Sequence, residues 1–197
     1  MSLLRTFIAI ELPQTIQEAI AREISGLRRQ VNRGLVRWVA AQNLHLTLRF
    51  LGDTAESSLD QIEQMLARQA AQFQPMEIEI GGFGSFPNPR RPRVFWIGVQ
   101  APAELSTLQR RIENLAQSAG FEAETRPYSP HLTLGRVSQK ISSNEMQTLR
   151  SALETIRIGR LGSFTAEAVH LIRSDLRPEG AVYTTLFSAP LGAGNEN

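Results

Sequence analysis

The tetrapeptide His-Leu-Thr-Leu occurs twice in this sequence and holds the residues whose types and spacing could do chemistry. The copies occupy residues 45–48 and 131–134, and they contain two of the three histidines in the chain. In an extended strand the two leucines of each copy point to one face, while the histidine and the threonine point to the other. Each copy therefore predicts an imidazole and a hydroxyl side by side on a polar strand face.

Two imidazoles that titrate near neutral pH can act as base and acid in one reaction. If the two polar faces meet across a cleft, His45 and His131 could cleave a phosphodiester: one takes a proton from water, and the other gives a proton to the departing sugar oxygen. Thr47 and Thr133 could donate hydrogen bonds to the non-bridging phosphate oxygens, whose charge must be held in the transition state. The motifs therefore favour phosphodiester cleavage by acid–base catalysis.

A cation beside the phosphate would add to this stabilisation, and Arg49 and Arg136 are the candidates. Arg49 shares the polar face of the first copy by simple alternation. Arg136 has the parity of the leucines in the second copy, so it reaches the polar face only if the strand bulges or ends near Gly135.

Composition argues against several other chemistries. The chain has no cysteine, which excludes disulfides, thiolate nucleophiles, zinc–thiolate sites and iron–sulfur clusters. Neither tetrapeptide brings a carboxylate ligand, so no metal site is predicted. Lys140 is the only lysine among 21 basic residues and lies in a polar string without a motif, so a ligase that works through a lysine adenylate is not predicted. The third histidine, His170, is interpreted as structural.

Hydrophobic periodicity predicts strands and helices in an order that repeats. Strands are expected over 6–12, 37–39, 43–51, 76–80, 94–99, 131–137, 164–172 and 181–187. Helices are expected from Pro13 onward and over 58–73, 103–119 and 142–158, with Ser142 or Ser143 as the N-cap of the last one. Turns or loops are expected at 52–53 and over 81–93, where glycine and proline are frequent.

An internal repeat organises these elements. The string FIAIELP at 7–13 matches FWIGVQAP at 95–102, and LHLTLRF at 44–50 matches PHLTLGR at 130–136, with offsets of 88 and 86 residues. The repeat predicts an α+β fold with two pseudo-symmetric β-α-β-α-β lobes, whose antiparallel sheets flank a central cleft and carry their helices on the outside. The chain over 1–197 is then one bilobal domain, with lobes at roughly 1–88 and 89–190, strand exchange between them left open, and a tail over 191–197.

With their flanking residues, the two motifs resemble those of the 2H phosphoesterase superfamily. Within it the chain is similar to the RNA 2′,3′-cyclic phosphodiesterases, also called the 2′-5′ RNA ligase family. The strings that carry this resemblance lie at 5–13 (RTFIAIELP), 37–52 (RWVAAQNLHLTLRFLG), 83–99 (FGSFPNPRRPRVFWIGV), 126–136 (RPYSPHLTLGR) and 171–191 (LIRSDL…VYTTLFSAPL).

The resemblance implies hydrolysis of RNA 2′,3′-cyclic phosphate ends to 2′-phosphomonoesters, and in some members 2′-5′ joining of tRNA halves in vitro. His45 would give a proton to the leaving oxygen, and His131 would accept a proton from water. Thr47, Thr133 and Arg136 would bind the phosphate. No cofactor and no metal are implied.

The implied partner is RNA with a 2′,3′-cyclic phosphate end, either tRNA-like or an oligonucleotide. Arg90, Arg91 and Arg93 could contact its backbone phosphates or could lie in a solvated linker. Two alternatives stay open: a phosphodiesterase for small cyclic nucleotides such as an ADP-ribose cyclic phosphate, and a non-catalytic RNA-binding module. The paired motifs count against the second, because binding alone does not need two titratable groups.

The N-terminal stretch and the apolar runs bear on location. The stretch is short, contains Arg5 and lacks the small residues of a signal-peptide cleavage site. No apolar run approaches the ~18 residues that a membrane span needs. We therefore expect a cytoplasmic protein without membrane contact. No protein partner is implied, and a monomer is expected.

Overall fold

The two HLTL strands belong to different β-sheets. The structure is a computed structural model, and it describes residues 2–31, 34–178 and 180–192. Within these residues the chain forms two antiparallel sheets and four α-helices, so the expected α+β fold is confirmed. The first sheet consists of β3 (His45–Ala55), β1 (Leu3–Glu11), β8 (Ala168–Arg177) and β9 (Gly180–Pro190), in that spatial order. The second consists of β2 (Val36–Trp38), β6 (His131–Val137), β5 (Val94–Gln100), β4 (Met76–Phe86) and β7 (Arg160–Ala166).

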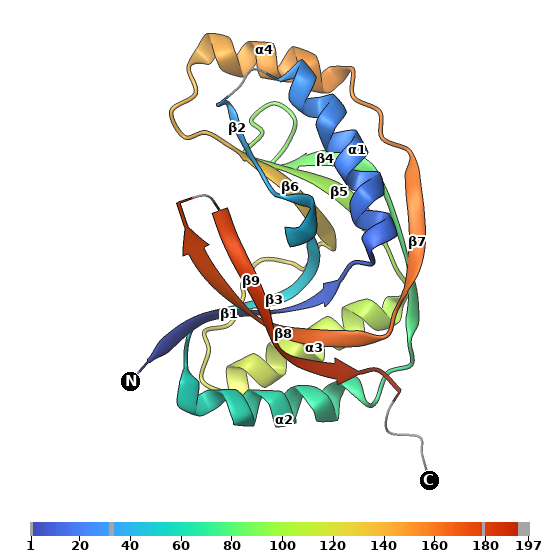
Figure 1. Cartoon of the computed structure of the whole chain (residues 1–197), viewed down its shortest axis with the longest axis vertical. Coiled ribbons are helices and arrows are strands. Elements are labelled where there is room, and N and C mark those ends of the chain that lie inside the picture. The colour runs from blue at the N-terminus through green and yellow to red at the C-terminus, as the bar shows by residue number, and fades with distance from the viewer. Residues whose placement is uncertain (1, 32–33, 179, 193–197) are drawn as a thin grey trace.

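The two sheets have equivalent strand orders. In each, the motif strand pairs with the strand that opens its sequence repeat: β3 with β1, and β6 with β5. Each sheet also takes strands from the other half of the chain, because β8 and β9 complete the first sheet, whereas β2 and β4 lie in the second. Figure 1 shows the C-terminal hairpin of β8 and β9 beside the N-terminal strand β1. Each half of the sequence therefore contributes strands to both sheets.

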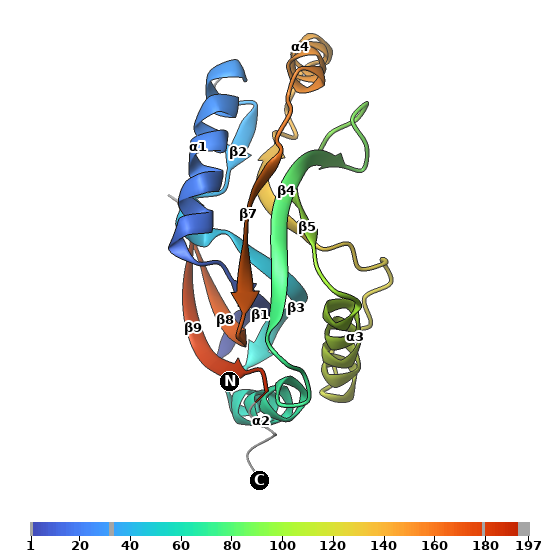
Figure 2. The ribbon, with the colours of Figure 1, turned by 90° about the vertical axis from the view of Figure 1, so that its right-hand side faces the viewer.

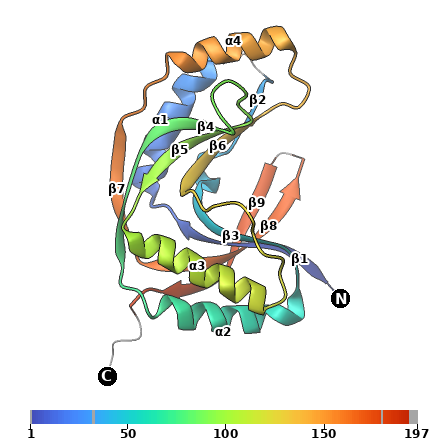
Figure 3. The ribbon, with the colours of Figure 1, turned by 180° about the vertical axis from the view of Figure 1, so that it is seen from behind.

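The four helices are α1 (Gln14–Gln30), α2 (Leu59–Ala70), α3 (Ala103–Ser118) and α4 (Ser143–Glu154), and the first three pack on the sheets through apolar stripes. The predicted stripe of α1 is buried and consists of Ile16, Ile20, Ile24 and Leu27. Helix α1 contacts β7 of the second sheet, whereas α2 and α3 contact each other and the first sheet (Figures 2 and 3). No helix among the described residues is long and apolar enough to cross a membrane.

The leucines of both motifs lie in one core together with the helix stripes. Leu46 and Leu132 are fully buried in it. The opposite face of the first sheet carries a small separate cluster of Phe7, Ala9 and Ile172, which packs against Tyr183. Strand alternation places the polar side chains of the first motif on this second face.

One predicted strand is two strands in the structure. The sequence pattern predicts a single strand over 164–172, but β7 ends at Ala166 in the second sheet and β8 begins at Ala168 in the first. Ala166 and Val169 are both buried, so the apolar pattern continues across the point where the chain changes sheets. Periodicity reports burial and does not report which sheet buries a residue.

One predicted turn and the first part of a predicted loop are strand residues. Strand β3 runs through 52–53 to Ala55, and β4 runs through 81–86, whereas 87–93 connect β4 to β5 as the predicted loop does. Gly84 has a packing role there, because a Cβ at this position would lie 2.2 Å from the ring of Trp96 on the neighbouring strand. At the C-terminal end, Leu191 is only 6% exposed and belongs to the core, so the expected tail does not begin at 191. Residues 193–197 of that tail lie outside the described residues.

Candidate active site

Each motif histidine is the first residue of its strand and is held in the same way. The Nδ1 atom of His45 lies 2.9 Å from the backbone oxygen of Asn43, and Nδ1 of His131 lies 2.7 Å from the backbone oxygen of Ser129. A carbonyl oxygen can only accept a hydrogen bond, so Nδ1 carries the proton in both rings. Nε2 is then the nitrogen that is left to accept or donate a proton in a reaction.

The strands that carry the histidines contact each other although they belong to different sheets. Strands β3 and β6 lie next to one another where the sheets approach (Figure 1). Leu134 of β6 also accepts a hydrogen bond from the backbone nitrogen of Val39, at 2.8 Å, in the segment that leads to β3. The fold therefore brings the two motif strands together from positions 86 residues apart in the sequence.

Aromatic rings border both histidines. The ring of His45 lies 4.5 Å from Phe7 and 5.2 Å from Tyr183 between centroids, and the second contact is edge-on. The ring of His131 meets Phe86 edge-on at 4.9 Å. These contacts limit the rotation of both imidazoles, and sequence reasoning did not assign this role to any of the three aromatic residues.

The strand register makes the surroundings of the two histidines different. His45 lies opposite Glu11 on β1, whereas His131 lies opposite Gly98 on β5. Burial lowers the pKa of His45 to about 4, against the opposing effects of the Asn43 carbonyl and of the Glu11 charge. His45 is therefore neutral near pH 7 in the free protein, with a lone pair on Nε2.

A β-bulge follows each motif threonine. Thr47 pairs with Ala9 and Arg49 with Ile8, so Leu48 has no partner in the register. In the second sheet Thr133 pairs with Trp96, while Gly135 pairs with Phe95, so that Leu134 is the extra residue. Both threonines keep the face of their histidine, and each bulge changes the face of the residues that follow it.

The second bulge turns Arg136 onto the polar face of β6. Gly135 and Val137 are buried on the core side, and Arg136 between them is exposed. A Cβ on Gly135 would lie 2.8 Å from a Val36 side-chain carbon, which shows how closely the core face is packed there. The sequence places Arg136 beside His131 and Thr133 only if the strand bulges or ends near Gly135. The backbone has this bulge, so Arg136 shares their face.

The first bulge has the opposite consequence for Arg49. Its side chain turns toward α3, where Nε lies 2.8 Å from Oε2 of Glu113, and it also donates to the backbone oxygen of Glu122. The Arg49 side chain is only 10% exposed. The expectation that Arg49 shares the face of His45 is therefore wrong, because simple alternation does not continue through the bulge.

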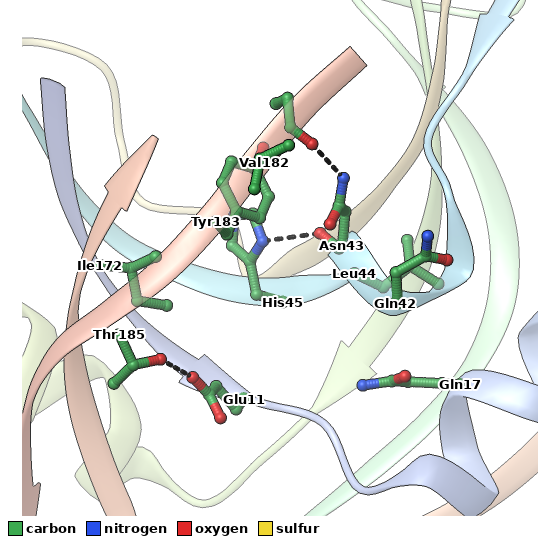
Figure 4. Close-up of a pocket in the computed structure, with 11 residues that line it drawn as sticks. Glu11, Gln17, Gln42, Asn43, Leu44, His45, Ile172, Val182, Tyr183 and Thr185 are labelled. Atoms are coloured by element: carbon green, nitrogen blue, oxygen red, sulfur yellow. Dashed lines mark hydrogen bonds between the residues drawn. The ribbon is translucent and has the colours of Figure 1, made fainter. Parts of the chain in front are cut away.

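A cavity of about 420 Å³ lies beside His45 (Figure 4). Thr185 closes one side and donates a hydrogen bond of 2.5 Å to Glu11, while Asn43 donates one of 2.6 Å to the backbone oxygen of Ala181 on β9. Most of its side chains are polar, so the cavity suits a ligand with several hydrogen-bonding groups. The lining residues are Glu11, Gln17, Gln42, Asn43, Leu44, His45, Ile172, Ala181, Val182, Tyr183 and Thr185.

The third histidine, His170 on β8, does not line this cavity. It pairs with Ala9 of β1, and its Nδ1 is 2.9 Å from the hydroxyl of Ser188. Burial lowers its pKa, although the charge of Glu11 acts on it in the opposite direction. In the described part of the chain, no group of three or more His, Cys, Asp or Glu side chains is placed to hold a metal ion.

The fold and the site define a class of protein: two sheets, each presenting one histidine–threonine pair from a repeated motif. The sequence model of the 2′-5′ RNA ligase superfamily matches residues 16–178, and the chain belongs to this superfamily. The family expected from the sequence is thereby confirmed.

Relatives cover nearly the whole chain. An RNA 2′,3′-cyclic phosphodiesterase of Methanothermobacter thermautotrophicus is 36% identical over 182 residues, which are 92% of this chain and 96% of that protein. One of Thermotoga maritima is 30% identical and covers 97% of both chains. The crystal structure of Escherichia coli LigT complexed with 3′-AMP superposes with a TM-score of 0.73 at 28% identity, over 96% of this chain and 99% of that one. TT0787 of Thermus thermophilus superposes with a TM-score of 0.79 at 25% identity, over 96% and 98% of the two chains.

Proposed function

We propose that this protein hydrolyses the 2′,3′-cyclic phosphate at an RNA end to a 2′-phosphomonoester, with His45 and His131 as its acid and base. The main support is that both histidine rings are held in the same way: each Nδ1 is hydrogen-bonded to the backbone carbonyl of the residue two positions earlier. The relatives named RNA 2′,3′-cyclic phosphodiesterase support the substrate, and the LigT complex with 3′-AMP shows a neighbour of this fold with a nucleotide.

The proposed step moves one proton at each histidine. Nε2 of His131 takes a proton from water, the water oxygen bonds to phosphorus, and the bond between phosphorus and O3′ breaks. Nε2 of His45 gives its proton to O3′, so the products are a 2′-phosphate and a 3′-hydroxyl. Thr47, Thr133 and Arg136 hold the non-bridging oxygens and stabilise the charge that they gain.

The low pKa of His45 sets a condition on this assignment. An acid must carry a proton, and burial keeps the pKa of the free His45 at about 4. The negative charge of a bound phosphate raises the pKa of a neighbouring imidazole, and the Glu11 carboxylate acts in the same direction. We therefore propose that His45 becomes an effective acid in the complex with substrate.

The same groups can also join two RNA ends. If the 5′-hydroxyl of a second RNA replaces water, His131 activates that hydroxyl and a 2′-5′ linkage forms while O3′ leaves. Acid and base are supplied by side chains, so we propose that neither reaction requires a metal. Activity that survives EDTA is expected, and a loss that a divalent ion restores would contradict this part.

We propose that the substrate is an RNA chain, tRNA-like or shorter, and not a small cyclic nucleotide. A non-catalytic RNA-binding module is the other alternative. We also propose a monomeric protein in the cytoplasm, which size-exclusion chromatography and cell fractionation would test.

The test is turnover of a short RNA that ends in a 2′,3′-cyclic phosphate. His45→Ala and His131→Ala should each lower kcat by about 10²- to 10⁴-fold, the usual contribution of a general acid or base. His170→Ala is the matched control, because it removes the third imidazole, whose ring is bonded to Ser188. Near-normal activity in either motif variant would overturn the mechanism, and binding without turnover by the wild-type protein would favour the RNA-binding module.

A further inference from the structure

Two arginines stand directly opposite each other at the edge of the second sheet. In the antiparallel pair of β2 and β6, Arg37 is the register partner of Arg136. Their neighbours Val36 and Val137 are buried on the core face, while both arginines are exposed on the other face. Like charges directly opposite on one face of a sheet destabilise the pair of strands.

No carboxylate compensates these two charges in the part of the chain that the structure describes. Four other arginines form ion pairs, and these are Arg49, Arg126, Arg160 and Arg173. Among the described residues, no carboxylate forms an ion pair with Arg37 or Arg136. Two opposed charges that cost stability and have no acidic partner in this part of the chain point to an anion from outside.

The charges of the pair reach Tyr183 in the first sheet. Burial raises the pKa of Tyr183 on β9, and the positive charges of Arg136, Arg37 and Arg5 act in the opposite direction. The guanidinium groups of Arg37 and Arg136 are therefore close enough to the phenol to influence it, although it belongs to the other sheet. Tyr183 also lines the cavity beside His45, so the two arginines lie near that cavity, although neither of them lines it.

Arg37 lies one strand farther from the second motif than Arg136 does. Thr133 and Arg136 are both on β6, whereas Arg37 is on β2, at about 4.8 Å of further strand spacing. Beyond the end of β6, the backbone oxygen of Arg93 accepts a hydrogen bond of 2.9 Å from the nitrogen of Val137. The loop that contains Arg93 therefore lies beside β6 on the side of β5, whereas Arg37 lies on the side of β2.

We propose that Arg37 forms a second anion subsite, which binds the phosphodiester on the 5′ side of the terminal nucleoside while Arg136 binds the cyclic phosphate. This proposal rests on the proposed function and extends it to the length of the substrate. The planar guanidinium matches two phosphate oxygens at once. A substrate with an internal phosphodiester is then held at two points, whereas a nucleoside 2′,3′-cyclic phosphate is held at one.

The test compares two substrates in the wild-type protein and in Arg37→Gln. Adenosine 2′,3′-cyclic phosphate has one phosphate, and the dinucleotide ApA with a 2′,3′-cyclic end adds one internal phosphodiester. For Arg37→Gln we expect KM for the dinucleotide to rise about 10- to 100-fold with kcat unchanged, because the contact is equal in ground and transition states. Both constants for the mononucleotide should stay as in the wild type.

The salt dependence and the stability of the variant give independent readouts. The slope of log KM against log salt for the dinucleotide should become less steep by about 0.7 in Arg37→Gln, the value for one contact to a single strand. The melting temperature of the free variant should be unchanged or higher, because one of two opposed charges is gone. Arg110→Gln is the matched control, since it removes an exposed arginine on α3 and should alter neither substrate.

The outcomes separate this inference from the proposed function. Equal losses on both substrates would assign Arg37 to the cyclic phosphate and overturn the second subsite, as would unchanged kinetics on the dinucleotide. A lower melting temperature together with losses on both substrates would indicate a structural role and would also overturn it. No turnover of either substrate by the wild-type protein would instead overturn the proposed function; the subsite is then tested by fluorescence anisotropy with a short 2′-phosphorylated RNA, where equal affinity of wild type and Arg37→Gln rejects it.

Discussion

The buried imidazole of His45 predicts a loss of stability in mild acid. Burial lowers its pKa from the usual 6.5 to about 4 in the folded protein, whereas the unfolded chain titrates near 6.5. Between these values the unfolded state binds a proton that the folded state does not, so stability is fully present above pH 6.5 and falls as the pH drops toward 4. The whole difference is worth about 3 kcal/mol, and the part between pH 7.5 and pH 4.5 is about 2.5 kcal/mol.

His45→Gln removes this proton linkage, because glutamine does not titrate. Urea unfolding of both proteins at pH 7.5 and at pH 4.5 gives four free energies of unfolding. The wild type should lose about 2.5 kcal/mol more than the variant between the two pH values, since all other groups titrate in both proteins. Ile62→Val is the control: it removes a methyl group from a fully buried site and should cost about 1 kcal/mol at both pH values.

Equal losses in the wild type and in His45→Gln would refute this reasoning. That result would mean that the imidazole is not desolvated in the free protein. The requirement that substrate raises the pKa of His45 before it acts as an acid would then lose its basis.

Three further predictions concern neighbours of the site. Glu11→Gln removes the carboxylate that raises the pKa of His45, so this pKa should fall further and the acidic limb of the kcat/KM profile should move to lower pH. Arg49→Met leaves its glutamate partner on α3 uncompensated at 14% exposure and should lower the free energy of unfolding by about 3 kcal/mol with KM unchanged; a rise in KM at intact stability would contradict its structural role. Gly84→Ala places a carbon 2.2 Å from the ring of Trp96 and should destabilise by about 1–3 kcal/mol in urea unfolding, and a neutral result would show that the ring moves freely.

Local patterns in the sequence were sufficient for the fold class and for most elements. Strands that alternate and helices with apolar stripes are short-range features, so β6 and the buried face of α1 follow from the residues themselves. The N-cap at Ser142 is equally local and is confirmed, because Glu145 completes a capping box with it. The repeat of the two HLTL strings also predicted that the two motif strands occupy equivalent places in the two sheets, as β3 and β6 do.

Features that depend on distant partners could not be predicted in this way. Whether a strand over 164–172 stays in one sheet depends on which strands are available to pair, and β4 and β1 lie far away in the sequence. The bulge at Leu48 is a property of pairing with β1, so Arg49 was placed on the wrong face. The pairing of Arg37 with Arg136 has no signal in either segment taken alone, since 99 residues separate them.

Only part of the environment of the two histidines could be predicted from the sequence. Alternation over Phe7, Ala9 and Glu11 would have placed a carboxylate opposite the first motif, had the pairing of the two strands been known. The carbonyl oxygens that fix Nδ1 belong to the backbone and have no residue signature. Roles for His45, His131, the two threonines and Arg136 stay predictions, with the geometry above in their support.

Identification of the product isomer tests the central claim most directly. The wild-type protein is incubated with a short RNA that ends in a 2′,3′-cyclic phosphate, in the presence of EDTA, and the terminal nucleotide is separated as its 2′- or 3′-phosphate. Proton donation to O3′ predicts the 2′-phosphate alone. A 3′-phosphate, or no product at all, would contradict the account.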